Sequence, residues 1–185
     1  NTIKNISNEL LRLEKVNSVN SILNVPLLQS SNKSLADILE GVPLLEDNIV
    51  DYLDAKKEFL NSPLYKSNLV SDDFRTTAIL VNLKENNKLS NIRDQIKILK
   101  KKIRDNSITE DELKVYNDLI TDLRNIRDIE RDVQASLIND TRNILNKYKS
   151  FGEIYLGGIP MIANDVVSFV KNDLKIFGIS ILIFL

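Results

Sequence analysis

The side chains that most often carry out chemistry in enzymes are missing from this chain. Its 185 residues include no histidine and no cysteine, so the commonest general base, the commonest metal ligand and the thiol nucleophile are absent. Two acidic pairs remain, Glu46-Asp47 and Asp72-Asp73. Neighbouring carboxylates can act as acid and base or bind calcium, but we favour roles in turns and helix caps.

A basic run is the most conspicuous charge feature. Its side chains could bind lipid headgroups, lipid phosphates or nucleic acid. An acidic segment follows it, and an antiparallel return of the chain would pair the two, which is the interpretation we favour. No aromatic residue interrupts the basic run, so we expect no nucleic-acid partner. The run comprises Arg93, Lys97, Lys100, Lys101, Lys102 and Arg104, and the acidic segment Glu110, Glu112, Asp118, Asp122, Asp128 and Asp132.

No motif supplies the missing chemistry. The chain has no Walker sequence, no Gly-x-Ser-x-Gly and no paired-cysteine metal site. Gly157, Gly158 and Pro160 shape a corner of the chain rather than a phosphate loop. The sequence therefore predicts no catalytic, cofactor-binding or metal-binding residues, and a protein that is not an enzyme.

The length and composition suit one folded domain, or one domain with an appendage. Hydrophobic residues make up 43% and charged residues 28% of the chain, and the net charge of −1 gives no general attraction to polyanions. The absence of cysteine is compatible with an exported bacterial segment. The polar, helical pattern of Asn1–Val16 is not a signal peptide, so either the chain is cytosolic or an upstream segment carries it across a membrane.

The C-terminal stretch changes character within one predicted helix. Ile154–Ile159 reads as a short strand, and a helix with one apolar face follows from about Asn164. After Lys175 the charges stop, and Ile176–Leu185 is almost wholly apolar. About ten such residues cannot span a bilayer, which needs roughly 20, so we expect the start of a transmembrane helix that is cut short. The alternative is a buried C-terminal helix.

This stretch resembles the end of the first extracytoplasmic loop of resistance-nodulation-division (RND) transporters. The shared pattern is strand, Gly157-Gly158-Ile159-Pro160, Asp165, apolar helix and Asn172-Asp173-Leu174. The branch it resembles contains the mycobacterial-type large membrane proteins and the hopanoid-associated exporters. Two upstream pieces fit the same family, namely Val16–Ile22 with Val25-Pro26, and Leu69–Asp73 before an apolar strand.

The resemblance implies a fold and a function. The fold is α+β, a ferredoxin-like βαββαβ porter-type domain whose first strand is missing, with an inserted helical hairpin and the start of a transmembrane helix. The function is that of a periplasmic porter segment in a proton-coupled exporter of hydrophobic or lipidic compounds, without catalysis or cofactors. Its partners would be the bacterial inner membrane, a lipid substrate, and further copies or a periplasmic adaptor.

Before residue 86 the chain alternates between helical and strand patterns. Apolar spacing predicts helices at Thr2–Val16 and Asp47–Leu60 and a short one at Leu35–Leu39. Period-two alternation predicts a strand at Val19–Val25. The near-continuous apolar run Thr76–Leu83 predicts a central strand covered on both faces.

From about Lys88 the pattern is that of two long helices. Leu89, Ile92, Ile96, Leu99 and Ile103 recur at steps of three and four, as in a coiled-coil seam. Asp105-Asn106-Ser107 ends the first helix. Thr109 and Glu112 then form a capping box that begins a second helix, which continues to about Tyr148. We expect an antiparallel hairpin whose seam is closed by its own two arms or offered to a partner.

The predicted organisation has four parts: residues 1–85 begin the porter subdomain, 86–150 form the hairpin insertion, 151–175 hold the last strand and exit helix, and 176–185 start the transmembrane helix. A second hypothesis is a membrane-anchored periplasmic scaffold or adaptor that binds a partner through the hairpin. A third, a cytosolic enzyme with a buried C-terminal helix, lacks catalytic groups.

Overall fold

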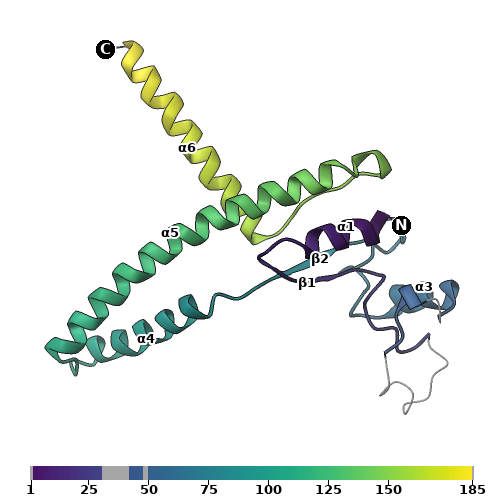
Figure 1. Cartoon of the computed structure of the whole chain (residues 1–185), viewed down its shortest axis with the longest axis horizontal. Helices are drawn as coiled ribbons and strands as arrows, with labels where there is room; N and C mark the ends of the chain where they lie inside the picture. The colour runs from purple at the N-terminus through teal and green to yellow at the C-terminus, as the bar shows by residue number, and fades with distance from the viewer. Residues whose placement is uncertain (1, 31–41, 48–49, 185) are drawn as a thin grey trace. The chain divides into compact units, whose positions relative to one another are not determined.

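The computed structural model describes residues 2–30, 42–47 and 50–184 (Figure 1). Of the described residues 63% are helical, and the described strands form one two-stranded antiparallel sheet. It divides into two compact units. The first comprises Asn1–Lys84 with Lys147–Gly152, and the second comprises Glu85–Asn146 with Glu153–Leu185.

The predicted ferredoxin-like βαββαβ fold is wrong. Within the described residues there are five α-helices and a single pair of strands. The expected final strand, Ile154–Ile159, is irregular backbone up to Gly157, and Ile159 already begins a helix. An apolar run becomes a strand only where another strand pairs with its backbone, and no strand among the described residues pairs with this segment.

The sheet pairs β1 (Val16–Asn20) with β2 (Leu80–Leu83). Val19 lies opposite Val81, and an irregularity in register falls between Val16 and Ser18. The expectation that Thr76–Leu83 forms a central strand covered on both faces is also wrong, because β2 is shorter and the side chain of Leu80 is 47% exposed. The predicted strand at Val19–Val25 is replaced by β1, which begins earlier and ends at Asn20.

Two helices of the first unit follow their predicted positions with shorter bounds. α1 (Thr2–Leu11) buries Ile6 and Leu10. α3 (Tyr52–Asn61) begins at Asp51, whose carboxylate accepts hydrogen bonds from the backbone N–H groups of Leu53 and Asp54, which is ordinary N-cap chemistry. Short 3-10 turns lie at Leu45–Asp47 and Lys149–Phe151. The helix predicted at Leu35–Leu39 lies outside the described residues.

The core of the first unit forms around Phe59 of α3. The Phe59 ring contacts Tyr65 edge-on, with 5.4 Å between centroids, and Phe74 at 6.2 Å. Edge-on aromatic pairs add stability beyond the area they bury. The buried residues of this cluster are Leu27, Val50, Ala55, Phe59, Leu69 and Val70.

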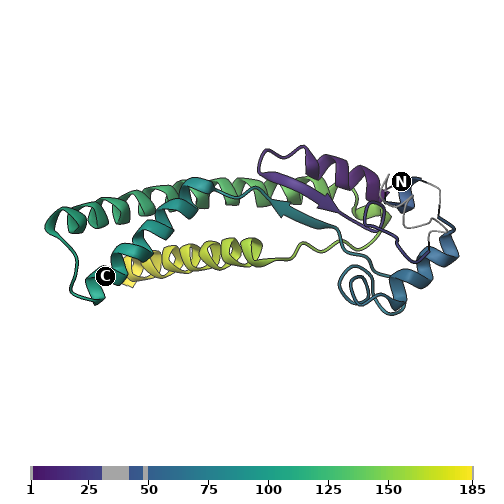
Figure 2. The ribbon, with the colours of Figure 1, turned by 90° about the horizontal axis from the view of Figure 1, so that it is seen from below.

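The second unit contains the long helices α4 (Asn87–Arg104), α5 (Glu110–Asn146) and α6 (Ile159–Phe184). α4 and α5 lie side by side in both views (Figure 1 and Figure 2). The two helices expected between about Lys88 and Tyr148 are therefore present. Ile92 and Leu123 are buried on their facing sides.

The turn between α4 and α5 is specified by its sequence. Asn106 has a φ of 51°, and its N–H and that of Ser107 donate to the carbonyls of Ile103 (3.2 Å) and Lys102 (2.9 Å), which is a Schellman motif with asparagine in the left-handed position. The predicted capping box follows: Glu112 N–H donates to Thr109 Oγ1 at 3.3 Å, and Thr109 N–H donates to Glu112 Oε2 at 3.1 Å.

Candidate functional site

Two polar contacts fix the register of the α4–α5 hairpin. Near the turn, Lys102 Nζ donates to Glu112 Oε1. At the other end, Asn86 Nδ2 donates to Glu130 Oε1 at 2.6 Å. Because the contacts join early α4 to late α5 and late α4 to early α5, the arms are antiparallel along the whole of α4. The hydrogen bond from Lys102 lowers the pKa of Glu112 below its ordinary 4.5.

Most of the basic run is not neutralised by the return arm. Of the predicted pairings, the structure shows Lys102 with Glu112. Arg104 contacts only its neighbour Asp105, at 3.8 Å. Among the described residues no ion pair is found for Arg93, Lys97, Lys100 or Lys101, all of which are exposed. The prediction that the acidic segment pairs with the basic run is thus wrong for most of its members.

Both acidic pairs act in local structure, as expected. Asp73 accepts hydrogen bonds from Ser71 Oγ (2.6 Å) and Arg75 N–H (3.1 Å), which lower its pKa. Asp47 accepts from the N–H of Leu44 at 3.2 Å. Within the described ranges, no three acidic side chains come together as a metal site would require.

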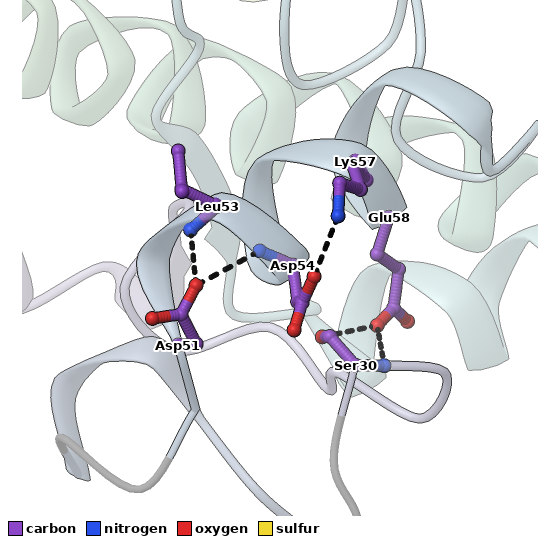
Figure 3. A network of polar contacts seen from close by, with 6 residues as sticks. All are labelled: Ser30, Asp51, Leu53, Asp54, Lys57 and Glu58. Carbon is purple, nitrogen blue, oxygen red and sulfur yellow. Dashed lines mark hydrogen bonds and ion pairs between the residues drawn. The ribbon is translucent and has the colours of Figure 1, made fainter.

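A buried carboxylate in the first unit was not singled out from the sequence. Glu58 of α3 is 5% exposed. It accepts hydrogen bonds from the N–H groups of Leu28 (2.9 Å), Gln29 (3.0 Å) and Ser30 (2.7 Å) and from Ser30 Oγ (2.6 Å). Figure 3 shows Ser30 beneath the carboxylate, with the Asp54–Lys57 ion pair of the same helix nearby.

A small cavity lies beside Glu58. It has a volume of about 230 Å³ and is lined by Gln29, Ser30, Asp54, Lys57, Glu58 and Asn61. The carboxylate of Glu58 is occupied by backbone donors, and Asp54 and Lys57 neutralise each other at 2.9 Å. A nucleophile or general base needs a lone pair directed at a substrate, and these groups direct theirs at the protein.

A second carboxylate holds the 3-10 segment of the first unit to α1. Glu9 accepts hydrogen bonds from Lys147 Nζ at 2.6 Å and Tyr148 Oη at 2.5 Å. These donors lower the pKa of Glu9, and the same contact raises the pKa of Tyr148. The contact joins residues far apart in the sequence, so the sequence pattern gave no sign of it.

The entry to α6 is set by Gly158, Pro160 and Asp165. Gly158 has a φ of 118°, a conformation that favours glycine, and Pro160 occupies the first turn of the helix, where its missing N–H costs nothing. One turn later, Asp165 accepts from Arg142 Nη2 of α5 with both carboxylate oxygens, each at 2.8 Å. The sequence predicts Asp165 in this helix but not its partner Arg142.

The far end of α6 is apolar on every side and exposed. Phe177, Leu182 and Ile183 are 65%, 78% and 74% exposed. The single hydroxyl of this stretch, on Ser180, donates to the carbonyl of Ile176 at 2.8 Å within the helix. The charged residues Lys171, Asp173 and Lys175 precede it. Over the part of the chain that the structure describes, no helix has both the length and the apolarity to cross a bilayer.

Comparison with protein-family models, curated proteins and solved structures finds no match for the chain. Its function must therefore be argued from its own residues. Among the described residues, the largest exposed apolar stretch is the end of α6.

Proposed function

We propose that this chain is an extracytoplasmic segment of a membrane transporter, of the RND exporter type, with the end of α6 entering the inner membrane. The observation that carries the proposal is the apolar end of α6, residues 176–183. An apolar groove on a partner protein would cover one side of a helix, whereas these side chains point outward all round it. Hydrocarbon covers all sides at once, and the internal bond of Ser180 suits an environment without water.

The preceding residues suit the boundary of a membrane. Lys171, Asp173 and Lys175 stand just before the apolar end, where long charged side chains can reach the headgroups. In this proposal the remainder of the chain lies on the periplasmic side and moves hydrophobic or lipidic cargo along a path without catalysing a reaction. Proton coupling would reside in other parts of the transporter. The proposal does not depend on a ferredoxin-like fold, which the chain does not have.

The second candidate is a membrane-anchored scaffold or adaptor that binds a partner through the α4–α5 hairpin. The exposed, unpaired charges of α4 favour it. The reading frame beyond Leu185 separates the two: a transporter requires four to five further membrane spans and then a second loop similar to this one, whereas a scaffold requires one span or none. A frame that encodes no apolar segment after Leu185 would rule out the transporter.

A further inference from the structure

The α4–α5 hairpin carries opposite charges on two opposite faces. An α-helix advances by about 100° per residue, so the position of each side chain around its helix follows from the sequence. The reference direction on each helix is its seam, the side that faces the other arm, marked by Ile92, Ile96 and Leu99 on α4 and by Leu119 and Leu123 on α5.

One face of the hairpin is basic. On α4, Arg93, Lys97, Lys100 and Arg104 lie about 100° from the seam in the winding sense of the helix, and on α5, Arg124 and Arg127 lie about 90° from it in the same sense. In two antiparallel helices that pack side by side, side chains rotated from the seam by the same angle in the winding sense of each helix lie on the same face of the pair. These six residues form one surface with Arg131 of α5, which lies about 100° from the seam in the same sense, and we call this surface the basic face.

The opposite face is acidic. It carries four aspartates of α5, which lie about 115° from the seam in the other sense: Asp111, Asp118, Asp122 and Asp132. They outnumber the two lysines on the same side, Lys102 of α4 and Lys114 of α5. Val115 and Ile129 lie among them and are 49% and 64% exposed. We call this surface the acidic face. Leu113, 43% exposed, lies on the basic face, so each face combines charge with exposed apolar area.

Most charges of the two faces have no ion pair among the described residues. The exceptions on the basic face are the 3.8 Å contact of Arg104 with Asp105 and the 3.0 Å contact of Arg131 with Asp128, and none is found for the four aspartates of the acidic face. The contacts between the arms, Lys102 with Glu112 and Asn86 with Glu130, involve neither these aspartates nor the cations of the basic face. A row of like charges on one face repels itself unless opposite charges cover it.

We propose that the hairpin binds a second copy of this chain, the basic face of one copy lying against the acidic face of the next. A second copy offers each face the opposite charge and exposed apolar side chains to pack against. An anionic lipid surface or an acidic polymer would cover the basic face only and leave the acidic face unsatisfied. Because two different surfaces meet, the contact is heterologous, and copies stack in one direction.

This proposal is independent of the transport function. The test measures self-association of the full chain in detergent micelles by analytical ultracentrifugation. Detergent covers the apolar end of α6, so association through that helix is suppressed. We expect association that weakens at least about tenfold between roughly 50 mM and 500 mM salt, since salt screens exposed charges. Apolar association would not weaken.

Charge-reversal variants test whether the basic face of one copy binds the acidic face of the next. In one variant, Arg93, Lys97 and Lys100 are replaced by glutamate; in another, Asp118, Asp122 and Asp132 are replaced by lysine. Each variant alone should lose association by about tenfold or more, and a mixture of the two should regain it, because each supplies the face that the other needs. Circular dichroism checks that both remain helical.

A matched control reverses three exposed cations of the first unit, Arg75→Glu, Lys84→Glu and Lys149→Glu, and should associate as the wild type does. The proposal is overturned if the wild type remains monomeric at low salt, if either reversed variant associates normally, or if the mixture fails to recover. Binding to phosphatidylglycerol vesicles that the glutamate variant loses, without self-association, would also overturn it and assign the basic face to a lipid surface.

Discussion

At the scale of single residues, carboxylates specify this structure through the donors that surround them. Glu58 holds residues 28–30, Glu9 holds Lys147 and Tyr148, and Glu112 holds both its own helix start and Lys102. Each accepts at least two hydrogen bonds. Charged acceptors form stronger hydrogen bonds than neutral ones, so replacing these residues has measurable effects.

Replacing Glu58 should destabilise the first unit more than replacing any exposed charge nearby. Glu58→Ala leaves the N–H groups of residues 28–30 without their acceptor, and we expect a loss of roughly 2–4 kcal/mol in unfolding free energy. Urea denaturation followed by tyrosine fluorescence measures it. The matched control is Lys57→Ala, which removes an exposed ion pair on the same helix and should leave the midpoint unchanged. Equal effects of the two variants would contradict the role assigned to Glu58.

The hairpin should lose stability in acid through Glu112. Its pKa is lower in the folded chain than the ordinary 4.5 because of Lys102 and Thr109. Ionised Glu112 therefore stabilises the folded chain above pH 4.5. This stabilisation is lost as the pH falls below 4.5 through the lowered pKa of the folded state. The melting temperature of wild type should fall more steeply in this range than that of Glu112→Gln. Glu110→Gln, in the same helical turn, should retain the wild-type slope, and parallel curves for all three would contradict the argument.

At the scale of elements, helices could be predicted from the sequence and strands could not. The steps of three and four from Leu89 to Ile103, the stop at Asn106 and the capping box at Thr109 are local signals, and local contacts produce the structure that they predict. A strand depends on a partner elsewhere in the chain. Ile154–Ile159 has the right composition but the structure pairs it with no other segment, so the predicted βαββαβ order failed.

The difference between local signals and contacts of distant residues also explains which parts of the candidate site could be predicted from the sequence. The apolar run of α6 and the charges of α4 and α5 can be read along the chain. Contacts between distant residues, such as Arg142 with Asp165 and Glu9 with Lys147, cannot. The expected neutralisation of α4 by α5 failed for a geometric reason: the carboxylates Asp118 and Asp122 lie on the side of α5 opposite to the one that carries Arg124 and Arg127.

The contact of Arg142 with Asp165 should fix the direction of α6 relative to α5. Asp165→Ala removes it, at a cost of about 1 kcal/mol or less because the pair is partly exposed. Since the chain has no cysteine, spin labels can be placed on cysteines at Asn139 and Lys171. Their distance distribution should broaden in Asp165→Ala and narrow again in the swapped pair Arg142→Asp with Asp165→Arg. An unchanged distribution in Asp165→Ala would show that other contacts hold α6.

At the scale of the whole molecule, the chain combines a small packed core, a charged helical hairpin and a helix with an apolar end. The carboxylate of Glu58 holds the backbone of the core through its hydrogen bonds to residues 28–30. The described residues leave two kinds of surface exposed: the apolar end of α6 and the charged faces of the α4–α5 hairpin. In our account a membrane covers the end of α6 and a second copy covers the two faces of the hairpin.

Whether the end of α6 enters a membrane can be decided by measuring its depth in a bilayer. Single cysteines at Val166, Ile179 and Ile183 carry a fluorophore, and the full chain is reconstituted into vesicles that contain brominated lipids, which quench only within the hydrocarbon. We predict strong quenching at Ile179 and Ile183 and little at Val166, with the change falling near Lys175. Equal, weak quenching at all three positions would show that α6 stays out of the membrane and would contradict the transporter proposal.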